Sequence, residues 1–125
     1  GRQQEGVRLL EEAYRGDSAN PSAAKVLGLA YAQAGQHEQA LPLLATALTS
    51  FPDSFVLLYR MGVCLDHQCR PADAVNCFER ALGQRPRVSK VMRALGYALE
   101  KLGERDRAVT YFKQADEIEG GGVSE

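Results

Sequence analysis

Apolar residues along the stretch 24–48 recur at intervals of three and four positions, which is the spacing of one face of an α-helix. The first set falls at i, i+3, i+4 and i+7 and consists of Ala24, Leu27, Gly28 and Tyr31. The second set falls at i, i+4, i+7 and i+8 and consists of Ala40, Leu44, Ala47 and Leu48. Gly35 lies between the sets, where a helix end often needs a left-handed residue. The pattern predicts a helical hairpin, and the small residues Gly28 and Ala40 predict close approach of its two helices.

The same residue classes return twice more at a period of 34 positions. The recurring residues are Leu27-Gly28, Met61-Gly62 and Leu95-Gly96, then Ala40, Ala74 and Ala108, and then Ala47, Ala81 and Ala115. A period that is kept through three copies without an insertion is typical of a repeat protein. Because one hairpin cannot bury its apolar face alone, we expect stacked copies that share a continuous core.

These residues and their spacing resemble the tetratricopeptide repeat family over positions 21 to about 119. The resemblance implies an all-α fold, a right-handed superhelical solenoid of antiparallel helix hairpins. Three repeat units are expected at residues 21–54, 55–88 and 89–119. Residues 1–19 match only the second helix of a unit, and they are expected to cover the front of the first hairpin. Residues 120–125 are expected to form a flexible tail.

Both ends of the chain break the period, which predicts a piece cut from a longer array. The outer face of the last hairpin then carries no closing helix, and Leu99, Val109 and Phe112 are expected to be partly exposed there. Such a face predicts weak self-association.

The formal net charge of −1 argues against a dedicated nucleic-acid binder, which usually carries a clear basic excess. No run of apolar residues approaches the roughly 18 residues of a membrane span. Three cysteines cannot form a complete set of intrachain disulfides, and reduced thiols fit a cytoplasmic protein. A processed or trimmed exported protein would share these features.

No constellation of residues predicts catalysis, a metal site or a cofactor. His37 and His67 fall on different helices, and no serine or cysteine is placed so that either of them could activate it. The run from Cys64 to Cys69 includes His67, but its spacing is not that of the usual paired zinc ligands. Cys64 occupies a position that holds alanine in the other copies, so it is expected to be a buried small hydrophobe. We therefore expect a non-enzymatic protein.

The resemblance to tetratricopeptide repeats also implies that the first helix of each unit lines a concave groove. Cations and aromatic residues gather at these groove positions, which favours an acidic or carboxylate-ended peptide. The predicted peptide-binding residues are Lys25, Leu29, Tyr59, Arg60, Val63, Lys90, Arg93, Tyr97 and Lys101.

The sequence thus predicts a protein–protein interaction scaffold or adaptor whose partner is a protein or peptide. Two alternatives stay open at this point. The chain could be the targeting or substrate-recruiting arm of a larger enzyme, or a self-assembling structural repeat.

Overall fold

The computed structural model describes residues 2–120, which form helices and connecting turns and contain no strand. The helices are α1 (Arg2–Gly16), α2 (Pro21–Gln33), α3 (His37–Ser50), α4 (Phe55–His67), α5 (Pro71–Gln84), α6 (Ser89–Lys101) and α7 (Arg105–Gly120). Residues 121–125, most of the expected tail, lie outside the described residues, whereas Gly120 still belongs to α7.

Side chains that accept backbone hydrogen bonds mark the starts of α2 and α4. The Asn20 side chain accepts a bond of 2.9 Å from the Ser22 amide, and Pro21 occupies the first turn of α2. Ser54 accepts a bond of 3.3 Å from the Leu57 amide at the start of α4. Helix α6 begins at Ser89 and has no side-chain cap bond.

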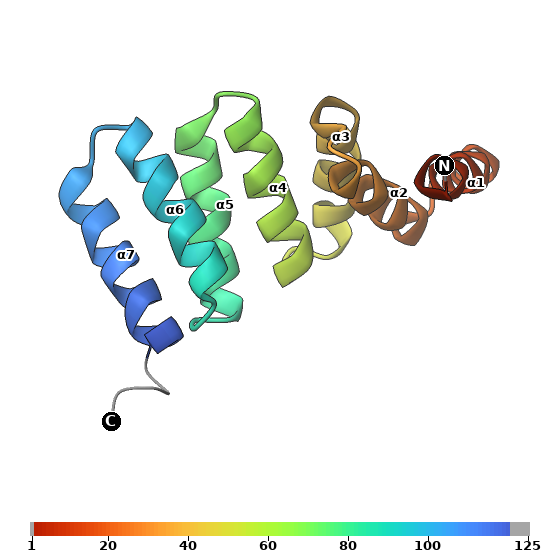
Figure 1. The fold of residues 1–125 in the computed structure, drawn as a ribbon. Helices are drawn as coiled ribbons and strands as arrows, with labels where there is room; N and C mark the ends of the chain where they lie inside the picture. Colours follow the sequence, from red (N-terminus) through yellow and green to blue (C-terminus); the bar gives the residue numbers. More distant parts are fainter. Residues whose placement is uncertain (1, 121–125) are drawn as a thin grey trace.

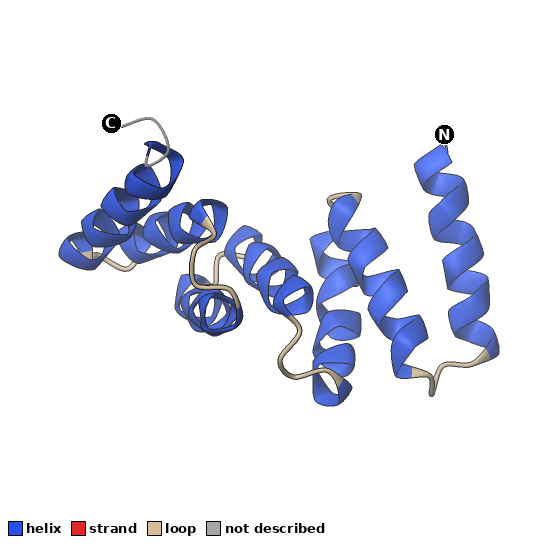
Figure 2. Ribbon diagram, turned by 90° about the horizontal axis from the view of Figure 1, so that it is seen from below, coloured by secondary structure: helices blue, strands red, loops and turns tan. Residues whose placement is uncertain are grey.

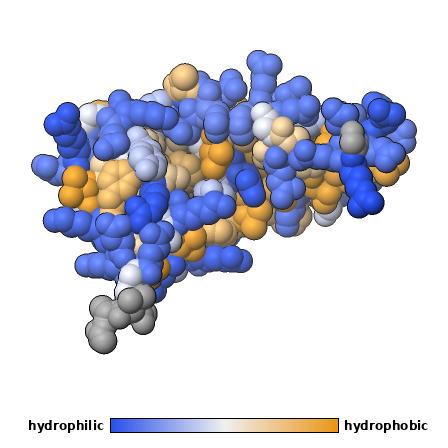
Figure 3. Space-filling model, in the orientation of Figure 1, coloured by the Kyte–Doolittle hydropathy of each residue, from blue (hydrophilic) through white to orange (hydrophobic). Residues whose placement is uncertain are grey.

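Successive helices run antiparallel and stack into a curved array, which confirms the predicted solenoid of helix hairpins (Figures 1 and 2). Each helix packs against the next one along the chain. In addition, α2 contacts α4 and α4 contacts α6, so the first helices of the three hairpins form one continuous face. Figure 3 shows apolar surface between polar side chains on the face that carries α4 and α6.

Glycines in the first helices admit bulky side chains from the second helices. A Cβ atom on Gly62 would lie 2.5 Å from Cε1 of Phe78, and one on Gly96 would lie 2.6 Å from Cε1 of Phe112. A Cβ on Gly28 would lie 3.1 Å from Cδ2 of Leu44. The residue nearest to Gly28 is therefore Leu44, four positions beyond Ala40, the alanine that the sequence pattern paired with it. Close approach is still the reason for glycine here, because a large side chain occupies the space.

Cys69 adopts a left-handed backbone conformation at the turn between α4 and α5. Its φ angle is 61°, and the corresponding residues Gly35 and Gly103 have φ angles of 80° and 81°. A side chain makes this conformation costly for an L-residue, which is why glycine occupies the other two turns. The repeat architecture, and not the residue at this position, therefore determines the backbone conformation of the turn.

Helix α1 covers the front of the first hairpin as expected, and Leu27 beneath it is buried. The Tyr31 hydroxyl donates a hydrogen bond to the Glu11 carboxylate and so joins α2 to α1. Burial, together with this acidic partner, raises the pKa of Tyr31 to about 12.

At the other end of the array the expectation for Leu99 is wrong. Leu99 is fully buried in the core together with Leu58, Phe78 and Leu95, whereas Val109 is 48% exposed and Phe112 is half-buried. Leu99 lies on the inner side of α6, so the packing of α6 against α5 already covers it.

Candidate functional site

An aromatic ring with two cations lies where α4 faces α6. The guanidinium of Arg60 lies 5.6 Å from the centroid of the Tyr59 ring, and the ammonium of Lys90 lies 5.5 Å from the same centroid. Tyr59 and Arg60 come from α4, whereas Lys90 comes from the first turn of α6. Contact between these helices brings together three predicted residues from two different repeats. We call these three residues the Tyr59 cluster.

Two further pairs of a cation and an aromatic ring extend this arrangement. The ammonium of Lys25 lies 5.0 Å from the centroid of the Phe51 ring, and the guanidinium of Arg85 lies 4.6 Å from that of Phe55. The Phe55 ring stacks beside Tyr59 with centroids 6.3 Å apart. Sequence reasoning missed Phe51, Phe55 and Arg85, because Phe51 and Arg85 lie in the connections between hairpins and not at groove positions.

A hollow of about 360 Å³ opens beside the Tyr59 cluster, between α1, α2 and α4. Its walls include Leu10, Val26, Leu29 and Val56, and Arg60 stands among its lining residues. Val26 and Val56 are 46% and 42% exposed, which is high for residues of this size and polarity. Leu29 was predicted as a site residue, but Leu10 was not, because residues 1–19 were expected only to cover the front of the first hairpin.

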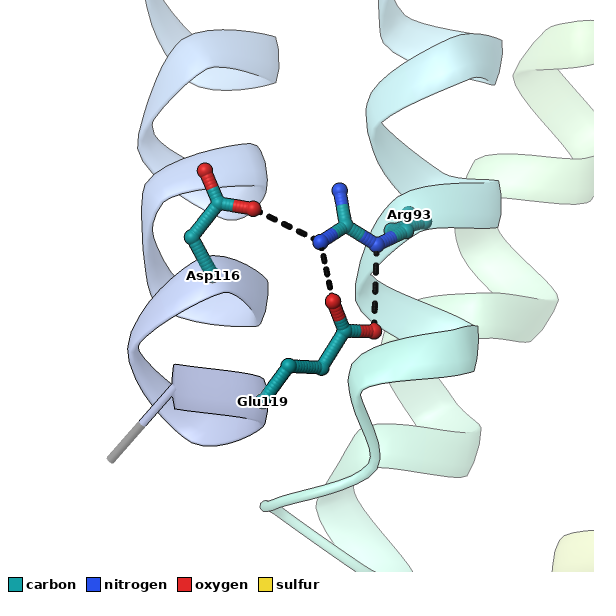
Figure 4. A network of polar contacts seen from close by, with 3 residues as sticks. All are labelled: Arg93, Asp116 and Glu119. Carbon is teal, nitrogen blue, oxygen red and sulfur yellow. Dashed lines mark hydrogen bonds and ion pairs between the residues drawn. The ribbon is translucent and has the colours of Figure 1, made fainter. Parts of the chain in front are cut away.

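Arg93 lies against α7 and not beside Lys90 (Figure 4). Its Nη2 atom donates a bond of 2.6 Å to Oδ1 of Asp116, and its Nε atom donates one of 3.2 Å to Oε2 of Glu119. These carboxylates raise the pKa of Arg93 and hold its charge at the end of the array, and Arg93 in turn lowers the pKa of Glu119. The cation is therefore already paired within the chain.

The remaining predicted residues lie away from the Tyr59 cluster or are partly covered. Nζ of Lys101 is 2.7 Å from Oδ1 of Asp66, an ion pair between the ends of α6 and α4. Tyr97 is 55% exposed, and its ring meets the Phe112 ring edge-on at 5.1 Å. Val63 is half-buried against the core. Tyr97 therefore packs between α6 and α7, and Lys101, which is already paired, contributes less free charge than its position predicts.

A histidine pair lies at the junction of the first two hairpins, where none was expected. The rings of His37 and His67 stack with centroids 4.0 Å apart and an interplanar angle of 12°. Nδ1 of His37 also lies 3.4 Å from Sγ of Cys64, a contact that the repeat spacing did not predict. His37 and Cys64 are 27 positions apart in the chain. They meet because the first residue of α3 lies in space beside the last turn of α4.

This contact does not prepare Cys64 for nucleophilic chemistry. Burial raises the pKa of the Cys64 thiol to about 11, and its side chain is fully buried. Burial, followed by the charge of His67, lowers the pKa of His37. Within residues 2–120, no three histidine, cysteine or carboxylate side chains are grouped so that they could hold a metal ion.

Comparison with known proteins identifies the repeat. One family model described as tetratricopeptide repeat matches residues 1–54 and 31–87, and a second such model matches residues 91–120. The chain belongs to the tetratricopeptide repeat family. The architecture of this family is that of a protein–protein interaction scaffold.

Several solved structures of this family resemble the whole chain. The structure of MamA MSR-1 is 36% identical with a TM-score of 0.90, and the match covers 98% of this chain and 71% of that chain. MamA AMB-1 is also 36% identical, with a TM-score of 0.91 and coverage of 97% and 72%. The MamA RS-1 double mutant, at 19% identity and a TM-score of 0.89, shares the fold and covers 100% and 70%. A search of the curated proteins finds no match.

No helix among residues 2–120 is both long enough and apolar enough to cross a membrane.

Proposed function

We propose that this tetratricopeptide chain is a non-catalytic adaptor that holds an acidic or carboxylate-ended peptide segment on its concave face. The observation that carries the proposal is the Tyr59 cluster, in which cations from two successive repeats approach one aromatic ring. Among the ion pairs of residues 2–120, neither Arg60 nor Lys90 has a carboxylate partner. A carboxylate from a partner would complete the arrangement through charge-assisted hydrogen bonds.

The positions of the other cations support this choice of surface. Arg93 and Lys101 are paired with carboxylates, so an incoming acidic segment would have to compete for them. Arg60, Lys90 and Lys25 rest against aromatic rings, an interaction of about 0.5–1 kcal/mol at exposed sites that leaves their remaining hydrogen-bond donors free. The site that we propose is therefore smaller than the one predicted from sequence.

The proposal includes the repeat units 21–54, 55–88 and 89–119 and a cytoplasmic setting. The three free thiols support a reducing compartment. The MamA structures, which share the repeat architecture, support a protein partner.

A pull-down read by mass spectrometry tests the site. The groove variant is Arg60→Glu with Lys90→Glu, and the control is Arg105→Glu with Lys113→Glu, which makes the same charge change on exposed residues of α7. We expect the groove variant to lose partners that the control retains, with circular dichroism showing that both are folded. Rising salt should weaken the same complexes, because ions screen exposed charges over about 8–10 Å. An unchanged set of partners for the groove variant would refute the proposed site.

One observation favours self-assembly as a second candidate function. Val109 is exposed, and Phe112 and Tyr111 are half-buried on α7, where no helix of the described residues packs against the outer side. Sedimentation velocity over a wide concentration range should then show a dimer that Val109→Asp weakens. A protein that is monomeric at every concentration would exclude this candidate.

A further inference from the structure

Aliphatic side chains from three helices line the hollow beside Arg60. These helices are the leading helix and the first helices of two successive repeats. Leu10 comes from α1, Val26 and Leu29 come from α2, and Val56 comes from α4. Together these side chains present aliphatic surface to solvent, and water in contact with such surface is released when a large apolar side chain covers it. The hollow is therefore suited to an apolar group of a partner.

The positive charge of Arg60 at the hollow favours an apolar side chain that has a carboxylate beside it. Arg60 is the one charged residue in the lining, and Gln33 is its only other strongly polar member. None of the ion pairs within residues 2–120 involves Arg60. A cation at the edge of an aliphatic hollow complements a ligand that carries an apolar side chain next to a carboxylate.

We infer that this hollow is the anchor subsite of the proposed peptide site, and that it takes a large apolar side chain adjacent to an aspartate or glutamate of a partner protein. The inference rests on the proposed function and adds to it a preference for one large apolar residue in the partner peptide. It also makes α1 a part of the binding surface, because Leu10 forms one wall.

The size and the position of the hollow both fit this occupant. A closed cavity of about 150 Å³ suffices to hold a benzene molecule, so a hollow of about 360 Å³ has room for an aromatic or leucine side chain. Arg60 belongs both to the hollow and to the Tyr59 cluster. A peptide anchored in the hollow would thus place its adjacent carboxylate at Arg60 and its further acidic residues toward Lys90.

Selection from a library of displayed random peptides tests the inference even though the partner is unidentified. The wild-type chain is used as bait, and the enriched sequences are read out. We expect them to carry phenylalanine, leucine or another large apolar residue next to an acidic one. The tightest peptide is then synthesised with a fluorescent label, and its affinity is measured by anisotropy.

Two substitutions separate the anchor from the charge. Replacing the apolar residue of the peptide with alanine should weaken binding about tenfold or more, the effect of losing one largely buried side chain. Val56→Asp should weaken binding of the parent peptide by a similar factor, because the substitution places a carboxylate in the hollow. Val109→Asp makes the same change at an exposed valine of α7 and should leave affinity unchanged at concentrations where the protein is monomeric.

The outcomes distinguish this inference from the proposed function. Acidic peptides that show no apolar preference, or that bind Val56→Asp as well as wild type, would overturn the anchor subsite and leave the proposed function intact. Enriched peptides without acidic residues, or no enrichment at all, would overturn both. If Val56→Asp instead dissociates a wild-type dimer, the hollow is occupied by a second copy and the inference is wrong.

Discussion

Substitution of Gly62 by alanine tests whether close packing between α4 and α5 sets the geometry of the central repeat. The added Cβ would lie 2.5, 2.7 and 3.0 Å from Cε1, Cδ1 and Cζ of Phe78. Ordinary contacts are about 3.4–4 Å, so the ring would have to move by roughly 1 Å. Phe78 is only 1% exposed and has no open side toward which to move.

The expected magnitude follows from two opposing effects. Overpacking of a closed core costs about 1–3 kcal/mol, and the severity of this overlap indicates the upper part of that range. Alanine recovers about 1 kcal/mol of helix propensity relative to glycine. The free energy of unfolding should therefore fall by about 1–2 kcal/mol, or Tm by roughly 4–8 °C for a chain of this size.

Two other glycines provide matched comparisons. Gly96→Ala meets Phe112 at similar distances, but that ring is half-buried on the last helix and can shift outward, so its cost should be smaller. Gly6→Ala lies inside α1 with no atom within 4 Å of the new Cβ, so it should stabilise the protein by about 0.5–1 kcal/mol.

Urea denaturation followed by circular dichroism measures all three variants, and an unchanged m value shows that the free energies are comparable. A Phe78→Leu background should relieve part of the Gly62→Ala cost in a double-mutant cycle. If Gly62→Ala is as stable as wild type while Gly6→Ala gains stability, the close contact with Phe78 does not exist.

Three further predictions concern the turn, the histidine pair and the thiols. Cys69→Gly should raise the free energy of unfolding by about 0.5–1 kcal/mol in urea melts, because it relieves the left-handed conformation, and a loss of stability would contradict the reasoning. Because His37 has a lowered pKa in the folded state, the unfolded chain binds its proton more readily, so stability should fall between about pH 7.5 and pH 5.5. His37→Gln should flatten that decline, and equal slopes for variant and wild type would exclude the histidine pair as its cause. A thiol reagent should label the exposed Cys69 quickly and the buried Cys64 and Cys77 slowly, whereas rapid labelling of Cys64 would show that its burial is wrong.

The predicted groove residues show which features of the surface the repeat spacing can predict and which it cannot. Repeat spacing indicates which residues of the first helices share a face, and it located Tyr59, Arg60 and Lys90 correctly on neighbouring helices. The spacing does not reveal which of these cations is already paired. Arg93 belongs to the same helix as Lys90, yet its guanidinium reaches Asp116 and Glu119, which lie 23 and 26 positions further along the chain.

The sequence by itself determined the repeat, because the period of 34 positions and the helical spacing within each copy depend only on local geometry. It also located the turns at Gly35 and Gly103, and at Cys69, which occupies the same place in the period. These features are repeated in every copy, so each copy supports the interpretation of the others.

The tertiary structure alone decided which residues meet between copies. The stacking of His37 on His67, the contact of Phe78 with Gly62 and the sharing of Arg60 between the hollow and Tyr59 depend on how helices pack. Packing depends on the volumes and angles of side chains from separate elements, which no single helix encodes. For that reason the family of this protein can be read from its sequence, whereas the shape and charge of the surface around Tyr59 require its three-dimensional fold.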